Sequence, residues 1–156
     1  MSTSILEASE EQLRSAQAKV TYLGTQEKPI PTVVFAPQGH NIAMQHFLPV
    51  QKTAQPYAND ESPYVLSFTV SSSEFRRMLL SVKPLLIEES QPSRLLSFTV
   101  VLVEASHVQG QEFFIPSTDS QAFYQELLKA LDAGNEKGRS ALQRQFRAVS
   151  PAQPKN

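Results

Sequence analysis

Histidine is the side chain whose charge most readily changes near neutral pH, so the histidines are the first candidates for acid–base or metal chemistry. His40 and His46 lie six positions apart in a long segment rich in proline. This is not the i, i+4 spacing of a zinc-binding pair on a helix, and a third ligand would have to come from Asp60, Glu61 or the distant His107. We therefore expect ordinary loop histidines, no metal and no cofactor.

The motifs that usually identify an enzyme are absent from the sequence. The chain has no Cys, which excludes disulfides, thiolate zinc sites and thiol catalysis. It also lacks the glycine-rich nucleotide motifs, the HExxH zinc motif and the GxSxG nucleophile motif. Ser71, Ser72 and Ser73 precede a predicted helix, where hydroxyl groups bond free backbone N–H groups. We interpret these serines as helix caps and predict no catalytic residue.

Positive charge gathers near the C-terminus. In a predicted helix over residues 136–149, Arg139, Arg144 and Arg147 lie around an apolar seam, so they are candidates for binding a partner. Such a helix could bind an acidic protein, RNA or a membrane surface. The competing interpretation is a terminal helix that packs Phe146 against the domain and leaves its arginines in water. We favour the second interpretation, because the basic residues are few and no aromatic stacking residues accompany them.

Length and composition describe a globular chain with little net charge. Its 156 residues fall in the usual range for one domain, and 40% of them are hydrophobic. The formal net charge of −1 gives no general attraction to nucleic acid or to an anionic membrane. The longest apolar stretches are far shorter than the roughly 20 residues of a membrane span. The N-terminus has no signal-peptide pattern, so we expect a soluble protein that is cytoplasmic by default.

The segment 64–131 has the clearest elements. Ser71 and Glu74 have capping-box spacing before a helix whose apolar residues recur at i, i+3, i+4 and i+7. Alternation predicts three strands, and Gly110 is expected in the turn between the last two. The predicted elements are strands 64–70, 95–104 and 111–115, a helix from Ser71 to Pro84, and a second helix that is capped by Ser117 or Thr118 and followed by Gly134 at its C′ position.

The flanking segments are less regular. Pro29 and Pro31 cannot donate ladder hydrogen bonds, so they indicate that the strand after them is an edge strand. That strand is expected to form a hairpin with the strand before it. The predicted flanking elements are a weakly ordered N-terminal helix over 1–19, strands 20–23 and 32–36, a long Pro-rich connection over 37–63, a helix over 136–149 and a disordered tail over 150–156.

These elements predict an α+β fold: an antiparallel sheet of about five strands, with the two capped amphipathic helices on one face and short terminal helices. The β-α-β-β-α order over 64–131 is compatible with most of a ferredoxin-like split βαβ unit. We expect residues 20–149 to form a single domain.

Two functions stay open for such a domain. The leading hypothesis is a non-enzymatic domain that binds a partner, expected to be a protein, through its sheet edge or the connection 37–63. The alternative is a small-ligand-binding or enzymatic domain with a pocket under that connection, where His40, His46 and Phe47 would contact the ligand. We do not expect nucleic-acid binding, and the sequence leaves the oligomeric state open.

Overall fold

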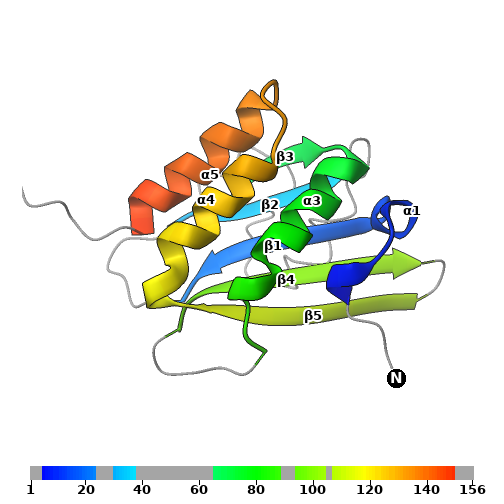
Figure 1. Ribbon diagram of the computed structural model, residues 1–156, viewed down its shortest axis with the longest axis horizontal. Coiled ribbons are helices and arrows are strands. Elements are labelled where there is room, and N and C mark those ends of the chain that lie inside the picture. The colour runs from blue at the N-terminus through cyan, green and yellow to red at the C-terminus, as the bar shows by residue number, and fades with distance from the viewer. Residues whose placement is uncertain (1–4, 24–29, 38–64, 89–93, 105–106, 150–156) are drawn as a thin grey trace, which may run out of the picture.

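A computed structural model describes residues 5–23, 30–37, 65–88, 94–104 and 107–149 of the chain. The strands are β1 (Ala16–Tyr22), β2 (Thr32–Pro37), β3 (Val65–Val70), β4 (Arg94–Glu104) and β5 (His107–Pro116). The helices are α1 (Glu10–Leu13), α3 (Ser72–Val82), α4 (Ser120–Ala130) and α5 (Glu136–Val149), and the 3-10 turns are η1 (Ile5–Glu7), η2 (Lys83–Leu85) and η3 (Ser117–Asp119). The predicted α+β class is confirmed (Figure 1).

The strands form one five-stranded sheet in the order β3-β2-β1-β4-β5. The prediction of a wholly antiparallel sheet is wrong, because β2 and β3 run parallel while the other neighbours are antiparallel. A parallel pair needs a crossover connection in place of a tight turn, and the chain between β2 and β3 is long enough to supply one. The edge position predicted for the strand at 32–36 is also wrong, since β2 lies inside the sheet and the edges are β3 and β5.

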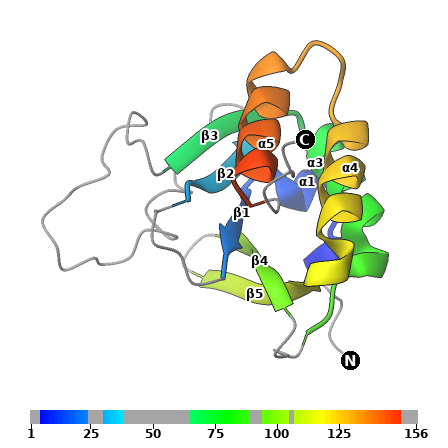
Figure 2. The same ribbon diagram turned by 90° about the vertical axis from the view of Figure 1, so that its left-hand side faces the viewer.

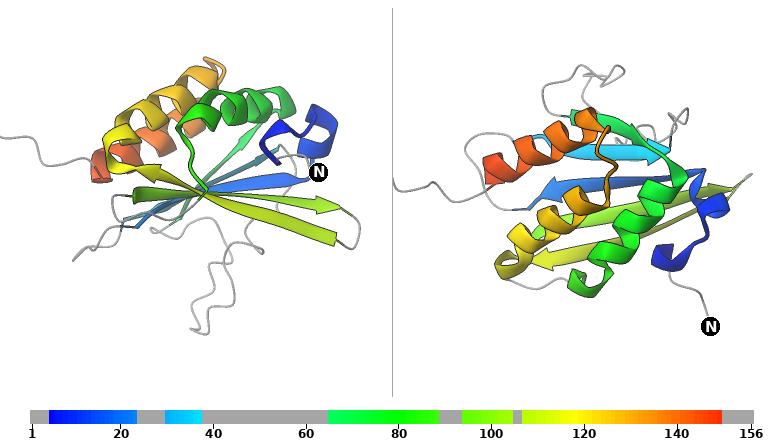
Figure 3. Two further views of the ribbon diagram at one scale, coloured as in Figure 1. Left: turned by 60° about the horizontal axis from the view of Figure 1, so that its bottom comes forward. Right: turned by 45° about the horizontal axis from the view of Figure 1, so that its top comes forward.

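All three longer helices lie on one face of the sheet, as Figures 2 and 3 show. The strand residues on this face belong to one core with the helices, and an aromatic group stands at its centre. The ring of Phe35 lies 5.3 Å from those of Phe68 and Phe75, and 6.3 Å from that of Phe98. This core therefore joins strands from the middle and the edge of the sheet to α3.

Helix α3 begins as its sequence predicts. The Ser71 hydroxyl accepts a hydrogen bond from the Glu74 N–H at 3.0 Å, and the Glu74 carboxylate accepts one from the Ser71 N–H at 2.8 Å. Phe75, Met78 and Leu79 are buried on its inner face. Both the capping box and the apolar stripe of this helix are confirmed.

The start of α4 differs from the prediction. The 3-10 turn η3 occupies residues 117–119, and α4 begins after it at Ser120, without a side-chain cap. Instead of capping the helix with its side chain, Ser117 accepts a hydrogen bond on its carbonyl from the Ser120 hydroxyl at 3.2 Å. The helix ends at Ala130, so Gly134 belongs to the loop before α5 and is not a C′ residue.

The N-terminal helix is much shorter than the predicted 1–19. Within the described residues it comprises η1 and the four-residue α1, whose Ser9–Gln12 capping box is present, and β1 begins at Ala16. Ala16, Ala18 and Val20 point into the main core, so the apolar residues at alternate positions fit a strand. Gly110 also differs from its predicted place: it lies inside β5 opposite Val101, and β4 and β5 already pair at Glu104 and His107.

Helix α5 covers the β2–β3 side of the sheet (Figure 1). Leu142 is buried and Phe146 packs against the core, so the predicted apolar seam is confirmed. Gly138 lies where α5 crosses β3, because a Cβ atom there would stand 2.7 Å from two ring carbons of Phe68. The glycine therefore sets how closely α5 approaches the sheet. Among the described helices, none is long and apolar enough to cross a membrane.

Candidate functional site

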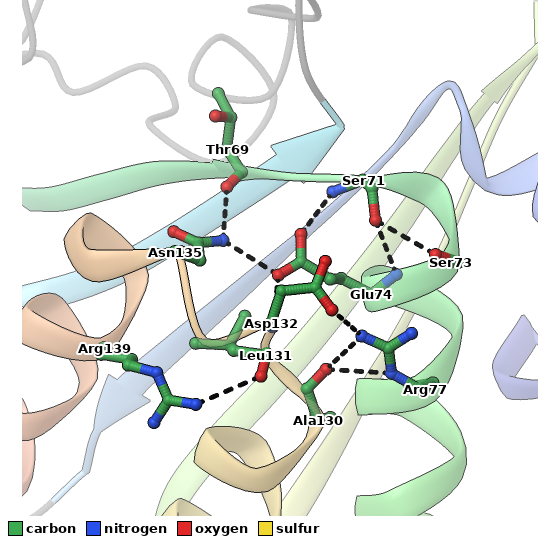
Figure 4. A network of polar contacts seen from close by, with 10 residues as sticks. All are labelled: Thr69, Ser71, Ser73, Glu74, Arg77, Ala130, Leu131, Asp132, Asn135 and Arg139. Carbon is green, nitrogen blue, oxygen red and sulfur yellow. Dashed lines mark hydrogen bonds and ion pairs between the residues drawn. The ribbon is translucent and has the colours of Figure 1, made fainter.

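Polar contacts between α3 and the loop before α5 converge on the Glu74 carboxylate (Figure 4). Besides the Ser71 N–H, it accepts hydrogen bonds from the Asp132 N–H at 2.7 Å and the Asn135 Nδ2 at 3.3 Å. Burial by itself would raise the pKa of Glu74, but these hydrogen bonds outweigh it and hold the pKa below its ordinary value. The carboxylate is thus charged, buried and paired on both oxygens.

Two other side chains drawn in Figure 4, those of Arg77 and Asn135, form hydrogen bonds with backbone groups at the ends of neighbouring elements. Arg77 donates from Nε and Nη2 to the Ala130 carbonyl at 3.1 and 3.0 Å, and from Nη2 to Asp132 at 2.6 Å. Asn135 donates to the Thr69 carbonyl at 3.0 Å and accepts from the Gly138 N–H at 3.0 Å. Since the polar groups at this junction bond one another, it fastens helices together and offers little to a ligand.

A second set of hydrogen-bonded side chains lies under α5. The hydroxyl of the buried Tyr124 donates to Gln145 Oε1 at 2.7 Å, and Gln145 Nε2 donates to the carbonyls of Val20 and Pro31 at 3.2 and 2.8 Å. Burial raises the pKa of Tyr124 far above its ordinary value, so the phenol stays protonated and can donate. This group ties α4 and α5 to β1 and to the residue before β2.

The sheet face opposite the helices, called the opposite face below, has a polar centre. One row of residues runs in register across all five strands: Ser67, Val34, Lys19, Thr99 and Glu112. The Ser97 hydroxyl donates to the Glu112 carboxylate at 2.5 Å. Burial lowers the pKa of Lys19, and the charge of Glu112 opposes that shift in part. Apolar residues flank this centre: Val34, Ala36, Val65 and Val101 form a second buried cluster.

Two polar side chains of this face have buried atoms without partners. Gln17 is fully buried, yet within the described part of the chain neither its Oε1 nor its Nε2 has a hydrogen-bond partner. The buried hydroxyl of Thr21, on the same strand, is likewise unpaired there. Native structures pair nearly all such atoms, so these two positions differ in kind from the paired junctions beneath the helices.

The outer edge of β5 is the other unsatisfied part of the sheet. Ile87 pairs with it at Phe114, where each residue donates its N–H to the carbonyl of the other at 2.9 and 2.8 Å. Because backbone groups alternate in direction along a strand, those of Val108, Gly110 and Glu112 point outward as well. No strand within the described ranges pairs with these three residues on that side. The Val108 residue is 50% exposed.

The candidate residues from the sequence fall into two groups. His40, His46 and Phe47 lie outside the described residues, and their ligand-binding role stays a prediction. His107 opens β5 at its pairing with Glu104. In the described parts of the chain, no three His, Asp or Glu side chains gather as a metal site requires.

The three arginines of α5 do not act alike. Arg139 is partly buried and donates from Nη2 to the Leu131 carbonyl at 3.3 Å, so it fastens the end of α4. Arg144 and Arg147 are exposed and bond no other described residue. The predicted packing of Phe146 against the domain is present, while the partner-binding role of the arginines stays a prediction.

Sequence reasoning misses the polar centre because the helix predicted over 1–19 includes Gln17 and Lys19. A signal was available, since Ala16 to Tyr22 alternates apolar and polar residues with the period of a strand.

No family model matches the chain, and comparisons with curated proteins and with solved structures give no match.

Proposed function

We propose that this chain is a non-enzymatic binding domain that receives an extended segment of a partner protein along the outer edge of β5. The observation that supports the proposal is the run of outward backbone groups at Val108, Gly110 and Glu112, which pair with no described strand. Such an edge is a template for another strand, and added strands are a common mode of peptide recognition.

The composition of β5 fits this role. Proteins usually block a sheet edge with lysine, proline or a bulge, and residues 107–115 contain neither Lys nor Pro. The irregularity in the β4–β5 ladder is confined to Arg94 and Leu96 on β4. Gly110 at the middle of the edge has no side chain to hinder an incoming backbone. The β5 edge is therefore suited to pairing along most of its length.

The side chains along this edge indicate which residue types the partner segment should carry. Val108 is apolar and half exposed, and Glu112, four residues on, is acidic. Opposite charges and apolar pairs stabilise facing positions of neighbouring strands. We expect an extended segment with an apolar residue and a basic residue four positions apart. The predicted likeness to ferredoxin-like folds adds nothing to the proposal, because a fold does not imply a function.

Selection from a random peptide library, followed by binding titrations, tests the proposal. Val108→Pro removes an outward N–H but no bond to β4, so it should weaken binding of the selected peptides roughly tenfold or more. The control Val108→Thr keeps the N–H and should stay within about threefold of the unchanged chain.

Amide hydrogen exchange provides the second readout. Bound peptide should protect the N–H groups of Val108, Gly110 and Glu112, which exchange quickly in the free chain. Peptides that bind Val108→Pro as well as the unchanged chain, or that protect another surface, would contradict the proposal.

A further inference from the structure

The opposite face of the sheet is buried, although the described helices α1, α3, α4 and α5 pack on the other face (Figures 2 and 3). Val34 and Val65 are 2% and 4% exposed, and Gln17 is fully buried. Val101, two strands away from Val34, is 7% exposed. A sheet face that meets water carries exposed side chains, so burial this complete requires a further layer of the protein on this face.

The chemistry of this face indicates what packs on it. One part, called the apolar corner below, is the buried cluster of Val34, Ala36, Val65 and Val101. Lys19 lies opposite Val34 on the neighbouring strand, and burial lowers its pKa, so it too is withdrawn from water. A layer that carries apolar side chains suits this corner best.

Two crossover connections join parallel strands of the sheet. β3 and β4 run parallel, because β1 is antiparallel to both β2 and β4 while β2 is parallel to β3. Helix α3 belongs to the connection from β3 to β4, which steps from the β3 edge toward β5. Residues 38–64, which lie outside the described ranges, connect β2 to β3 and therefore step the opposite way across the sheet.

The hand of these crossovers determines the face on which each belongs. A crossover between parallel strands of one sheet is right-handed in about 98% of cases. Two crossovers of the same hand that step in opposite directions must lie on opposite faces. Because α3 lies on the helix-covered face (Figure 3), the connection 38–64 belongs on the opposite face. It is longer than the dozen or so residues that a parallel crossover needs.

One half of this connection has the composition that the apolar corner requires. Residues 51–62 are mostly polar, whereas residues 41–50 include four large apolar side chains: Ile42, Met44, Phe47 and Leu48. We propose that residues 41–50 of this chain pack on the opposite face of the sheet, with their apolar side chains against the apolar corner. The chain then occupies this face itself, and the backbone groups along the β5 edge stay open to a partner.

Nuclear magnetic resonance of the full chain with labelled valine methyl groups tests the contact. Nuclear Overhauser effects should connect the ring protons of Phe47 with the methyl groups of Val34 or Val101. Phe47→Leu should remove these cross-peaks and so assigns them to that ring. Phe47 cross-peaks to Val100, which lies in the core beneath the helices, or to no valine at all would overturn the proposal.

Relaxation of the same methyl groups by a soluble nitroxide measures whether the face is covered. In the unchanged chain, the methyl groups of Val34 and Val101 should relax about as slowly as those of the core residue Val100. Phe47→Ser should raise their relaxation rates roughly twofold or more, because the nitroxide then reaches the apolar corner. Tyr57→Ser, in the polar half of the connection, is the matched control and should leave the rates unchanged. Slow relaxation of Val100 in both variants shows that the core is intact.

Two further results would overturn the proposal. Fast relaxation of Val34 and Val101 in the unchanged chain would leave the face open to an external partner. Slow relaxation that appears only at high protein concentration would assign the face to a second copy of the chain. Val108→Pro should leave these rates unchanged, so failure of this contact is distinguishable from failure of binding at the β5 edge.

Discussion

The two faces of the sheet each bury a glutamine amide, and they differ in whether that amide is hydrogen-bonded. Beneath the helices, the Glu74 carboxylate and the Gln145 amide are bonded by partners from other elements. On the opposite face, the amide of Gln17 is equally buried but bonds no described residue. One buried glutamine, Gln145, is therefore hydrogen-bonded through its amide, and the other, Gln17, is not.

The difference separates buried groups whose hydrogen bonds stabilise the fold from buried groups that contribute no such bond. Removing a buried group that is hydrogen-bonded destabilises the fold, because its partner is then left without a hydrogen bond. An unpaired buried group is already unfavourable in the folded state, so removing it relieves a penalty. Stability measurements on matched variants of the two faces can therefore confirm or reject the comparison.

The largest effect is expected on the helix-covered face, where Phe35 fills the aromatic core. Phe35→Ala should lower the free energy of unfolding by about 3–5 kcal/mol, because it leaves a cavity between Phe68, Phe75 and Phe98. Val34→Ala, the next residue on the opposite face, should lower it by about 2 kcal/mol. Urea unfolding monitored by circular dichroism measures both. Equal losses would show that the two faces contribute alike to the core.

The next largest loss of stability is expected at Glu74, because its carboxylate accepts hydrogen bonds from three donors. Glu74→Gln places an NH₂ group against a backbone N–H, and it should lower the free energy of unfolding by about 2–3 kcal/mol. A control is Glu136→Gln, at an exposed position in the first turn of α5, for which we expect a change within about 0.5 kcal/mol.

The contribution of Glu74 should also depend on pH. Its pKa in the folded chain lies below its ordinary value of 4.5, so the carboxylate stabilises the fold fully above the unfolded pKa. That contribution is lost as the pH falls through the folded-state pKa. Urea unfolding between roughly pH 7 and pH 3 should show the gap between the unchanged chain and Glu74→Gln narrowing on acidification. A gap that stays constant with pH would contradict the assignment of the effect to the charged carboxylate.

A smaller loss is expected at the Tyr124–Gln145 pair. Tyr124→Phe removes the hydroxyl that donates to Gln145 Oε1 and leaves that oxygen buried and unpaired. The free energy of unfolding should fall by about 1–2 kcal/mol. Tyr22→Phe is the matched control, since its hydroxyl has no partner among the described residues, and it should change stability little. Equal effects would show that the bond to Gln145 contributes nothing.

Local patterns predict much of this fold. The Ser71–Glu74 box and the apolar stripe after it depend on neighbours within one or two helical turns, so the start of α3 is readable from the sequence. The strand at 94–104 is long and apolar and is predicted to within one residue. The seam of α5 is predicted for the same reason, since its period is that of a helix.

Long-range pairing is not readable in this way. Asp132 and Asn135, which donate hydrogen bonds to the Glu74 carboxylate, lie 58 and 61 positions away from it along the chain. The parallel pairing of β2 with β3 depends on a crossover, and nothing in either strand specifies its partner. The polar centre is missed because Lys19 lies opposite Thr99, and through it in line with Glu112, only when β1 pairs with β4 and β4 with β5.

The smallest effect, and the one of opposite sign, is expected at Gln17. Gln17→Leu removes two buried polar atoms that bond no described residue and replaces them with apolar groups beside Val101. The free energy of unfolding should stay the same or rise by up to about 1 kcal/mol, whereas Gln145→Leu should lower it by about 1–3 kcal/mol. These two glutamines are alike in chemistry and burial and differ in their partners, so urea unfolding of both variants tests the comparison directly. A loss at Gln17 as large as that at Gln145 would mean that its amide is bonded in the folded chain, and the two faces would then follow the same rule.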